Sequence, residues 1–563
     1  MKIAKCFVKA FVKLVYVAAA AISFLLLCIN LYSLVNWLWD RKPTLPNVAC
    51  FMVLLCLFAL FMVVLVSTRF VMLIKNRTLF IVALILLSFA TKALFVIGID
   101  TTQYSDFALL LDTTYEIAEG SRSYLQLPYY QTWPYQTGFP AVMSIFSKLF
   151  GGNITVLLLI NCMFAAGTNV LVYCIARQKT DEKAARVAAI IYLIFPYVLG
   201  LSSVYTNQHL ATFLFYVGVY VLFRYSKSRF IAPLTAGLLL ALGNSIRPEG
   251  VLFIASIVGY AIFNILGSNA DKFEIGRESK KQCQIKSSDN TELDIKVSSA
   301  VNGGNGNDIE NITDDKVVKE YKHSTAKTGK LPRWISVVVS YFLFFNIVSQ
   351  IFIVTGLNPD GLTNDFPLYK FAVGLNHSTN GSYSDEDVSI LFGEAQRSSR
   401  DEEALRMIRE RLSVPLFSII RLFKNKASIM WVARWRYPAF FDTPNEAIFK
   451  LRSLEVSVGR LNTMFTFVDY LIYLIFYLII FLSSLLTVAG KKKPAAPYFA
   501  ILIAATFVVF LIIEVQYRYA YIAMPAIFIW SAEGAELLYS ERLLNIKIRR
   551  IKADGNLSPN TDL

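Results

Sequence analysis

The most regular feature of the chain is a series of long apolar runs separated by short polar stretches. Several runs reach the roughly 20 residues that an α-helix needs to cross about 30 Å of hydrocarbon. The pattern predicts an all-α fold, a polytopic transmembrane helical bundle with about 12 spans. We place the spans roughly at residues 14–38, 48–73, 79–98, 154–176, 186–202, 207–223, 231–246, 250–267, 334–355, 466–489, 496–513 and 519–537.

The pattern changes after the third run, where carboxylates and apolar residues are interleaved. The apolar positions that share one helix face are Phe107, Leu110, Leu111, Thr114, Tyr115 and Ala118. Asp112, Glu116 and Glu119 fall on the opposite face. A helix of this kind lies in the membrane interface. A second short apolar helix is predicted to end at Gly151.

Asp106 stands at the start of this interfacial helix, only a few residues after the end of a span. Helix physics offers one explanation, because Asp106 or Ser105 would be an ordinary N-cap. A second explanation is chemical, because a carboxylate at this depth could accept a proton from a substrate. The residues alone leave both explanations open.

Composition supports the membrane class: 55% of the residues are hydrophobic and only 17% are charged. The net charge of +15 does not indicate a nucleic-acid surface, because the basic residues gather in short clusters between the apolar runs. Such clusters mark cytoplasmic loops under the positive-inside rule. A cytoplasmic N-terminus places every cluster on that side. Both termini are then cytoplasmic, and the segments 99–153 and 356–465 are extracytoplasmic.

The stretch 270–333 has a different composition from the rest. It is polar, carries charges of both signs and is rich in Gly, Asn and Ser, so it cannot bury enough surface to fold alone. We therefore divide the chain into two extra N-terminal spans (1–78), a transmembrane module with the external loop 99–153 (79–269), a disordered cytoplasmic insert (270–333), C-terminal spans with the external loop 356–465 (334–540) and a cytoplasmic tail (541–563).

Two arginines, Arg247 and Arg518, stand at external membrane boundaries, where a charge requires a partner. An arginine is well suited to bind phosphate, because its planar guanidinium gives two parallel hydrogen bonds. The structural alternative is that Arg247 pairs with Glu249 and Arg518 with Glu514 to neutralise charge near the bilayer. Tyr519, next to Arg518, could present its hydroxyl or its ring face to a sugar.

Three further candidate residues have equally plain structural explanations. His209, at the external end of a span, could contact a substrate or serve only as a polar residue at a helix end. Arg434 and Arg436 lie in the aromatic and basic stretch "WVARWRY", which could hold a substrate phosphate or anchor the chain at the interface.

Several short motifs occur in a characteristic order. The acid Asp106 and the interfacial helix are followed by a Pro/Tyr-rich loop with "TGFP", and then by a helix ending "KLFG". Farther on come "LGNSIRPEG" (242–250) and "EVQYRYAYIAMPAI" (514–527). This set resembles the glycosyltransferase C superfamily, in the branch of protein O-mannosyltransferases and lipid A aminoarabinose transferases. The likeness covers about 79–267 well and 334–537 loosely.

The resemblance implies that Asp106 is the catalytic carboxylate and that the sugar is inverted at its anomeric carbon. Phe107 stands where the family often has a second acid, and the sequence leaves a divalent cation open; no metal ligands or other cofactors are identified. We predict substrate-binding roles for Tyr104, His209, Arg247, Glu249, Arg434, Arg436, Gln516, Arg518 and Tyr519.

The predicted protein is a multi-pass cell-membrane glycosyltransferase. It would take a sugar from a polyprenyl-phosphate donor and give it to an extracytoplasmic acceptor, which is a cell-wall polymer, a glycolipid or a protein. Its partners would be that donor, membrane lipids and the acceptor, without nucleic acid. A lipid-linked polysaccharide polymerase or ligase is one alternative. A flippase or transporter is another, although its two similar halves are not apparent here.

Overall fold

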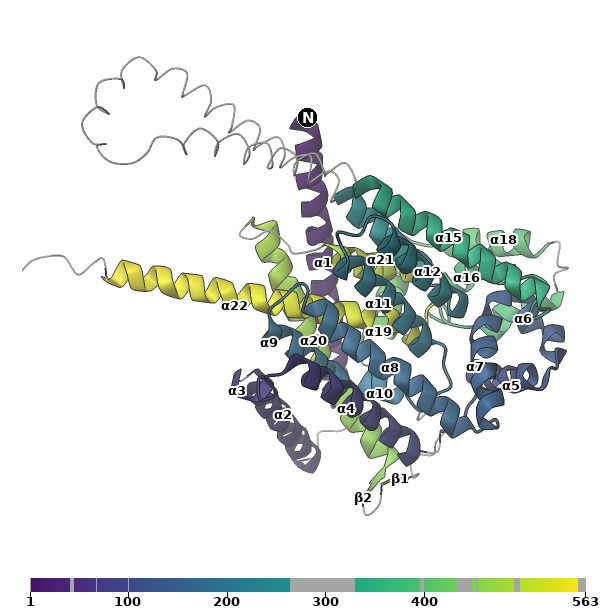
Figure 1. Ribbon diagram of the computed structural model, residues 1–563, viewed down its shortest axis with the longest axis horizontal. Coiled ribbons are helices and arrows are strands. Elements are labelled where there is room, and N and C mark those ends of the chain that lie inside the picture. The colour runs from purple at the N-terminus through teal and green to yellow at the C-terminus, as the bar shows by residue number, and fades with distance from the viewer. Residues whose placement is uncertain are drawn as a thin grey trace, which may run out of the picture.

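The computed structural model is a bundle of helices with one short β-hairpin (Figure 1). It describes residues 2–40, 45–66, 68–99, 101–263, 330–394, 399–432, 448–451, 454–490 and 497–554. The predicted helical class is therefore confirmed. The two strands β1 (Ile448–Leu451) and β2 (Leu454–Ser457) form an antiparallel pair that the prediction lacked.

Six helical stretches are long and apolar enough to cross a membrane, and four shorter apolar helices accompany them within the described part of the chain. The count of about 12 spans remains a prediction. The long helices of the bundle are α1 (Lys2–Asp40), α4 (Arg77–Gly98), α8 (Ile154–Ala176), α15 (Lys330–Val354), α20 (Val458–Val488) and α22 (Met524–Asp554). The other helices are α2 (Leu45–Val66), α3 (Thr68–Val71), α9 (Glu182–Leu193), α10 (Pro196–Gly200), α11 (Gln208–Arg224), α12 (Ile231–Ile246), a helix at Gly250–Phe263 and α21 (Tyr498–Ile512).

Several predicted boundaries differ from the structure for local reasons. The run 186–202 is split into α9 and α10, because Pro196 lacks the N–H that a continuing helix needs and holds Phe195 in an extended conformation. The run 519–537 begins as the 3₁₀-helix η6 (Tyr517–Ala523), and α22 then continues to Asp554. Helix α15 begins at Lys330, so the predicted disordered insert is too long by four residues at its C-terminal end. Residues 264–329 and 555–563 lie outside the described residues.

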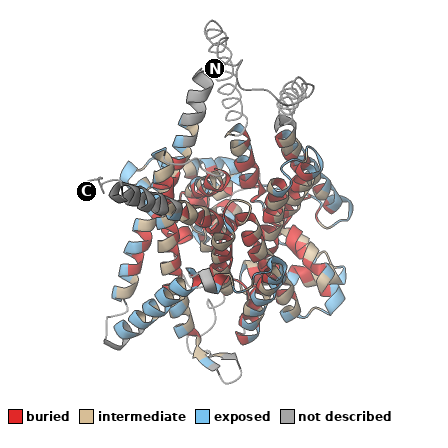
Figure 2. Ribbon diagram, turned by 60° about the vertical axis from the view of Figure 1, so that its left-hand side comes forward, coloured by how far each residue is buried: buried red, intermediate tan, exposed pale blue. Residues whose placement is uncertain are grey.

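The bundle is built from neighbours that are often distant in sequence. Helix α1 packs along α20, α11 lies between α8 and α12, and α12 packs on α15. The buried amide of Asn30 on α1 donates to the Tyr470 carbonyl on α20 at 3.0 Å. Figure 2 shows buried residues concentrated on the central helices, whereas the outlying helices carry many exposed positions. Because exposed positions on α2 and α4 are apolar, they are suited to contact with lipid.

The described part of the segment 99–153 folds as two longer helices, with a third, five-residue helix and two 3₁₀ turns between them. Helix α5 (Asp106–Glu119) buries Phe107, Leu110, Leu111 and Thr114, as its apolar spacing predicts. It packs against α7 (Gly138–Phe150), which ends at Gly151. Between them lie η1 (Ser123–Gln126), α6 (Pro128–Thr132) and η2 (Pro134–Thr137). Gly138 is required at the start of α7, because a Cβ there would lie 1.6 Å from the Ser245 carbonyl oxygen at the end of α12.

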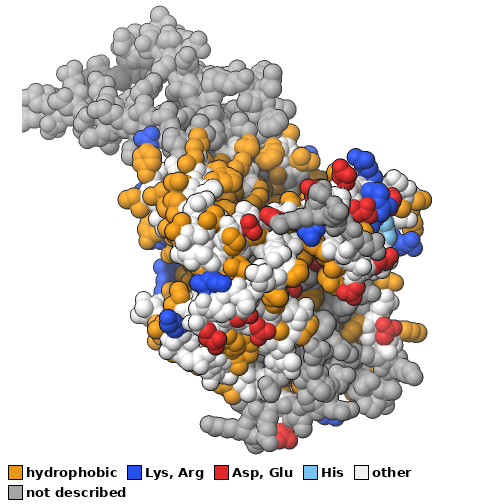
Figure 3. Space-filling view, turned by 90° about the vertical axis from the view of Figure 1, so that its right-hand side faces the viewer, with side chains coloured by type: hydrophobic (Ala, Val, Ile, Leu, Met, Phe, Trp, Pro, Cys, Tyr) orange, Lys and Arg blue, Asp and Glu red, His pale blue; other side chains and the backbone are white. Residues whose placement is uncertain are grey.

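Residues 366–432, which we name the loop module, form most of the second large segment. Its helices are α16 (Pro367–Gly374), α17 (Asp385–Val388), the π-helical turn Ser389–Glu394, α18 (Arg400–Leu412) and α19 (Leu416–Trp431). A small apolar core that includes Phe366, Tyr369 and Met407 holds them together. Inside it, Arg411 donates to both oxygens of the buried Asp387, at 2.6 and 3.0 Å. Figure 3 shows charged side chains gathered toward one edge of this side of the molecule, beside a largely hydrophobic surface.

Candidate active site

Asp106 is the first residue of α5. The N-cap position is occupied by Ser105, which makes no side-chain cap. The carboxylate of Asp106 instead accepts a hydrogen bond from the guanidinium of Arg518, 412 residues farther along the chain. Ser105 thus stands at the predicted N-cap position but makes no capping side-chain bond, and Asp106 itself is not the cap.

The chain just before Asp106 is held in an unusual conformation. Ser105 has a positive φ of 51°, which is uncommon for any residue with a side chain. The preceding loop is tied to residues 203–205: Thr101 Oγ1 bonds Ser203 Oγ at 2.8 Å, and the Tyr205 N–H donates to Gln103 Oε1 at 2.7 Å. Strained backbone of this kind persists where the surroundings fix it, and it is frequent at functional sites.

Arg518 lies on η6 with only 9% of its side chain exposed, whereas Asp106 is 31% exposed. Its Nε donates to Gln516 Oε1 at 2.7 Å, and its guanidinium stands 4.6 Å from the centre of the Phe107 ring. Burial lowers the pKa of the Arg518 guanidinium, but the neighbouring Asp106 carboxylate more than offsets this, so its pKa is raised. Arg518 is therefore a permanent cation at this position.

Arg247 follows the last residue of α12 and forms a second cationic group. Its Nε donates to Glu249 Oε1 at 2.7 Å, as predicted for the structural alternative, and its Nη1 donates to Asn207 Oδ1 at 3.0 Å. The guanidinium also lies 5.2 Å from the centre of the Tyr519 ring. The pKa of the Glu249 carboxyl is raised by burial, which outweighs the opposing effect of Arg247. Glu249 Oε2 is buried and has no hydrogen-bond partner among the described residues.

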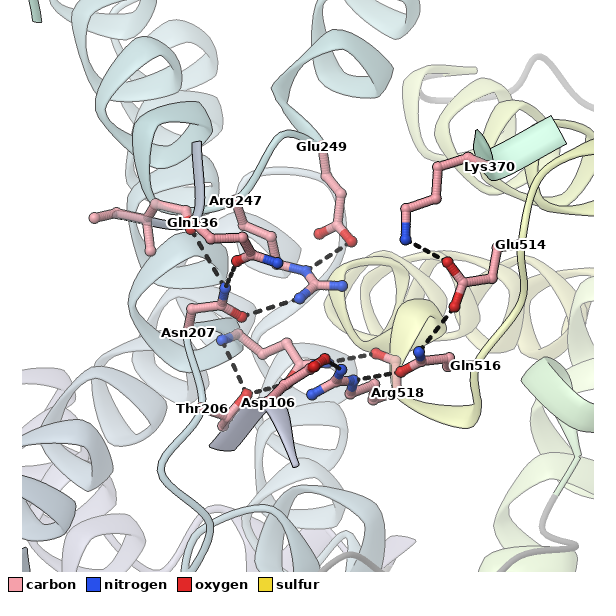
Figure 4. Close-up of polar contacts among 12 residues, drawn as sticks. Asp106, Gln136, Thr206, Asn207, Arg247, Glu249, Lys370, Glu514, Gln516 and Arg518 are labelled. Carbon is pink, nitrogen blue, oxygen red and sulfur yellow. Dashed lines mark hydrogen bonds and ion pairs between the residues drawn. The ribbon is translucent and has the colours of Figure 1, made fainter. Parts of the chain in front are cut away.

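Two consecutive residues at the start of α11 connect the two arginines. Asn207 accepts from Arg247, and the side-chain amide of Gln208 donates to the Arg518 carbonyl at 2.9 Å. Asn207 also donates to Gln136 Oε1 at 3.4 Å, which links the group to the 99–153 segment. Asn207 thus holds the Arg247 guanidinium, which Figure 4 shows near Arg518, while Gln208 fixes the backbone of Arg518.

Glu514 does not pair with Arg518, so that part of the structural alternative is wrong. Its carboxylate forms an ion pair with Lys370 of α16, and its Oε1 accepts from Gln516 Nε2 at 3.0 Å. The geometry explains the choice, because Gln516 lies between Glu514 and Arg518 and binds both (Figure 4).

The remaining predicted residues have different positions. Tyr104, two residues before the candidate base Asp106, stacks edge-on against Phe107 at 5.7 Å between ring centres. His209 is buried away from this network, with Nδ1 at 2.6 Å from the Tyr521 hydroxyl and Nε2 at 3.1 Å from the Leu201 carbonyl oxygen. We leave His209 out of the site proposed below. Arg434 and Arg436 lie outside the described residues.

Sequence reasoning missed Gln136, Asn207, Gln208 and Lys370. The adjacent amides Asn207 and Gln208 at the start of an apolar run were a visible signal, because polar side chains at the end of a span need partners. Lys370 had no such signal. Its place beside Glu514 depends on how the loop module docks, which no local pattern encodes.

A metal ion finds little support in the described residues, where no group of three or more His, Cys, Asp or Glu side chains is placed to hold one. The partner of Asp106 is a guanidinium, which competes with a cation for the same oxygen. The next residue, Phe107, offers no ligand and packs its ring beneath Arg518. We therefore derive no step that involves a metal.

The fold and the site together define a multi-pass helical membrane protein whose loops bring acidic and basic side chains to one polar site. Residues 137–272 match the family model for dolichyl-phosphate-mannose-protein mannosyltransferases. This match confirms the predicted resemblance to glycosyltransferases of the mannosyltransferase type. It includes Arg247, Glu249 and the two α11 amides, whereas Asp106 and Arg518 lie outside it.

Among solved structures, the chain is similar to the archaeal oligosaccharyltransferase AglB from Archaeoglobus fulgidus, determined in complex with an inhibitory peptide and a dolichol-phosphate. The identity is 11% and the TM-score 0.36, with 86% of this chain and 52% of that chain covered. The chain thus spans about half the length of that structure. A comparison with curated proteins finds no match.

Proposed function

We propose that this protein is a membrane glycosyltransferase that takes a sugar from a polyprenyl-phosphate donor and transfers it to an extracytoplasmic acceptor hydroxyl. The observation that carries the proposal is the ion pair between Asp106 and Arg518, a partly exposed carboxylate beside a buried, permanent cation. The family match over 137–272 supports the donor class. The apolar helices around the site support a donor whose tail lies in the bilayer.

The proposed reaction is a single displacement at the anomeric carbon. The acceptor oxygen forms a bond to this carbon while the bond from the carbon to the phosphate oxygen breaks. Asp106 accepts the proton of the acceptor hydroxyl, and the phosphate leaves with the electron pair. A base within hydrogen-bond reach typically contributes about 10² to 10⁴ in rate. Attack opposite the leaving phosphate inverts the sugar.

The two arginines would stabilise the phosphate as it gains negative charge. Arg518 is bound to Asp106 in the structure, so a donor phosphate at Arg518 would also lie close to the base. Arg247 is held by Glu249 and Asn207 and would supply the second cation. Preorganised donors of this kind are usually the largest contribution to catalysis, because they need no reorientation during the reaction. Tyr519, whose ring centre lies 5.2 Å from the Arg247 guanidinium, would contact the sugar.

The test is transfer of radiolabelled sugar from synthetic polyprenyl-phosphate sugars to endogenous acceptor in purified membranes. Asp106→Asn removes the base but keeps the size of the side chain, so we expect loss of about 10² to 10⁴ in rate. The matched control is Asp112→Asn, an exposed acid on the same helix, which should transfer at the wild-type rate.

Equal transfer by wild type and Asp106→Asn would overturn the assignment of the base. If the wild type consumed no donor from a broad panel but moved intact lipid-linked sugar across vesicles, a flippase would replace the transferase. If it extended lipid-linked chains instead, a polymerase would replace it.

A further inference from the structure

The stretch 513–516, which leads from α21 into the site, is bound by the loop module along its backbone. The Glu514 N–H donates to the Lys370 carbonyl at 2.7 Å, and the Val515 N–H donates to the Gly381 carbonyl at 2.9 Å. These bonds come from α16 and from the turn that follows it. The path of the chain just before Gln516 is therefore set by the loop module.

Lys426 of α19 fixes the same stretch from a second direction. Its Nζ donates to the carbonyls of Ile513, at 2.7 Å, and Gly374, at 2.6 Å, and its side chain is buried. Gly374 itself lies against this stretch, since a Cβ there would be 2.3 Å from the Ile513 carbonyl carbon and 2.5 Å from the Glu514 nitrogen. Only glycine permits this close approach, so the position of the loop module and the path of residues 513–514 depend on each other.

The side chains continue the connection to the candidate base. Lys370 pairs with Glu514, Glu514 accepts from Gln516, Gln516 accepts from Arg518, and Arg518 pairs with Asp106 (Figure 4). The Lys370 ammonium also lies 5.4 Å from the centre of the Trp133 ring in the 99–153 segment. A single polar chain thus runs from the loop module to Asp106.

We propose that the loop module is a positioning element for the active site, in which Lys370 and Glu514 orient Gln516 and, through it, the Arg518 guanidinium. The proposal rests on the function proposed above, because it assigns Arg518 to the leaving phosphate. Lys370 and Glu514 are positioning residues in this scheme, since they act through Gln516 and Arg518.

The charges explain why Lys370 matters. The Glu514 side chain is only 2% exposed, and Lys370 is the cation paired with it in the described structure. Without Lys370, a buried carboxylate would lose its counter-ion, which is costly unless the carboxylate becomes protonated or recruits another cation. Either response changes what Gln516 binds. The orientation of Arg518 is then no longer fixed.

The first experiment compares Lys370→Met with Lys370→Arg in full-length protein purified in detergent with lipid. Misplacing a catalytic group by about 1 Å can cost about 10²-fold, so we expect Lys370→Met to lower kcat/KM for the donor about 10- to 100-fold. The KM for the acceptor should not change. Lys370→Arg keeps the ion pair and should stay within about 3-fold of wild type. Lys148→Met, at an exposed lysine of α7, is the charge-matched control.

The double variant Lys370→Met/Glu514→Gln separates positioning from simple loss of folding. It leaves no unpaired charge, and the amide oxygen introduced by the Glu514→Gln change can still accept from Gln516. We expect it to regain about 10-fold in donor kcat/KM over Lys370→Met alone.

Gly374→Ala tests the docking itself, with Gly393→Ala as the matched control. Gly393 lies in the same module and has only the Ser389 hydroxyl near its added Cβ, at 3.8 Å. We expect a fall of about 10-fold or more in donor kcat/KM for Gly374→Ala and wild-type values for Gly393→Ala.

The outcomes distinguish this inference from the proposed function. If wild type transfers sugar, Asp106→Asn does not, and Lys370→Met keeps wild-type donor kcat/KM while remaining folded, the inference is wrong and the function stands. If Lys370→Met changes donor and acceptor parameters alike and the double variant regains nothing, the module is only a structural support. If wild type transfers no sugar, the proposed function fails first.

Discussion

Two clusters of paired charges in this protein use the same residue types in different ways. One surrounds Glu182 at the start of α9, in the basic region predicted to be cytoplasmic. Its Oε1 accepts from Tyr173 at 2.6 Å and Arg186 at 2.8 Å, and its Oε2 is paired with Arg177 at 2.7 Å and Arg77 at 3.1 Å. Both carboxylate oxygens are thus fully used.

The other cluster contains Asp106, and its carboxylate behaves differently. It is 31% exposed and is paired with one guanidinium, from Arg518, whereas Glu182 is 15% exposed and meets three. Nearby, Glu249 Oε2 remains without a partner in the described structure. A carboxylate with all of its acceptor sites filled can only hold helices together. A carboxylate with free acceptor capacity can still receive a proton.

The partners also differ in their separation along the chain. Arg177 and Arg186 lie within five residues of Glu182, so that cluster forms largely as α8 and α9 turn into each other. Asp106 and Arg518 are 412 residues apart and meet only when the bundle is complete. We therefore expect the Glu182 cluster to govern stability and the Asp106 cluster to govern activity.

The largest expected effect is on the activity side. Arg518→Gln should lower kcat/KM for the donor about 10²- to 10³-fold, because it removes the preorganised cation that we assign to the leaving phosphate. Steady-state transfer assays with donor and acceptor varied separately measure this. Arg421→Gln, at an exposed arginine of α19, is the control and should leave the donor kcat/KM at its wild-type value. A loss matched by an equal fall in folded protein would instead place Arg518 with the structural cluster.

The converse change is Glu182→Gln, which should act on stability. It leaves three guanidinium groups beside a neutral amide. Arg186 is buried, but Arg77 and Arg177 are 63% and 37% exposed and are screened by water, so we expect a cost of about 1 to 2 kcal/mol. Thermal unfolding of detergent-solubilised protein should show a lower midpoint, while kcat per folded molecule stays at the wild-type value. A reduced kcat at an unchanged midpoint would contradict the separation of the two clusters.

A smaller effect is expected at Arg247. Arg247→Lys keeps the charge but cannot reproduce the planar pair of bonds to Glu249 and Asn207, so we expect about a 10-fold loss in donor kcat/KM. The same change at the exposed Arg229 serves as control. Wild-type kinetics for Arg247→Lys would show that catalysis needs only the positive charge at this position, and not the planar pair of hydrogen bonds.

The smallest effect concerns pH. Burial raises the pKa of the Glu249 carboxyl above its ordinary value near 4.5. The folded protein then binds this proton more tightly than the unfolded chain, so this group's contribution to stability falls as pH rises from about 4.5 through the raised folded-state pKa. Glu249→Gln should flatten that part of a plot of unfolding midpoint against pH. Glu119→Gln, on the surface of α5, should leave the slope unchanged.

Much of the fold was predictable because its signals are local. Apolar runs of sufficient length, the helical spacing that begins at Phe107 and the glycine that ends α7 all depend on neighbours a few residues away. The choice of Asp106, Arg247 and Arg518 came from charges at the ends of apolar runs, where the cost of burial makes an ionisable residue informative. The helix break at Pro196 also has a local signal, the proline itself, but the continuous apolar run around it led to the prediction of a single span.

The sequence by itself therefore determined the membrane class, the helical bundle and the identity of the main charged candidates. Only the tertiary structure decided the pairing: Arg518 binds Asp106 rather than the nearby Glu514, and Glu514 binds Lys370, 144 residues away. The physical reason is that hydrophobicity and helix periodicity are properties of a short stretch of chain. The partner of a buried charge depends instead on which distant segment the packing brings within about 3 Å.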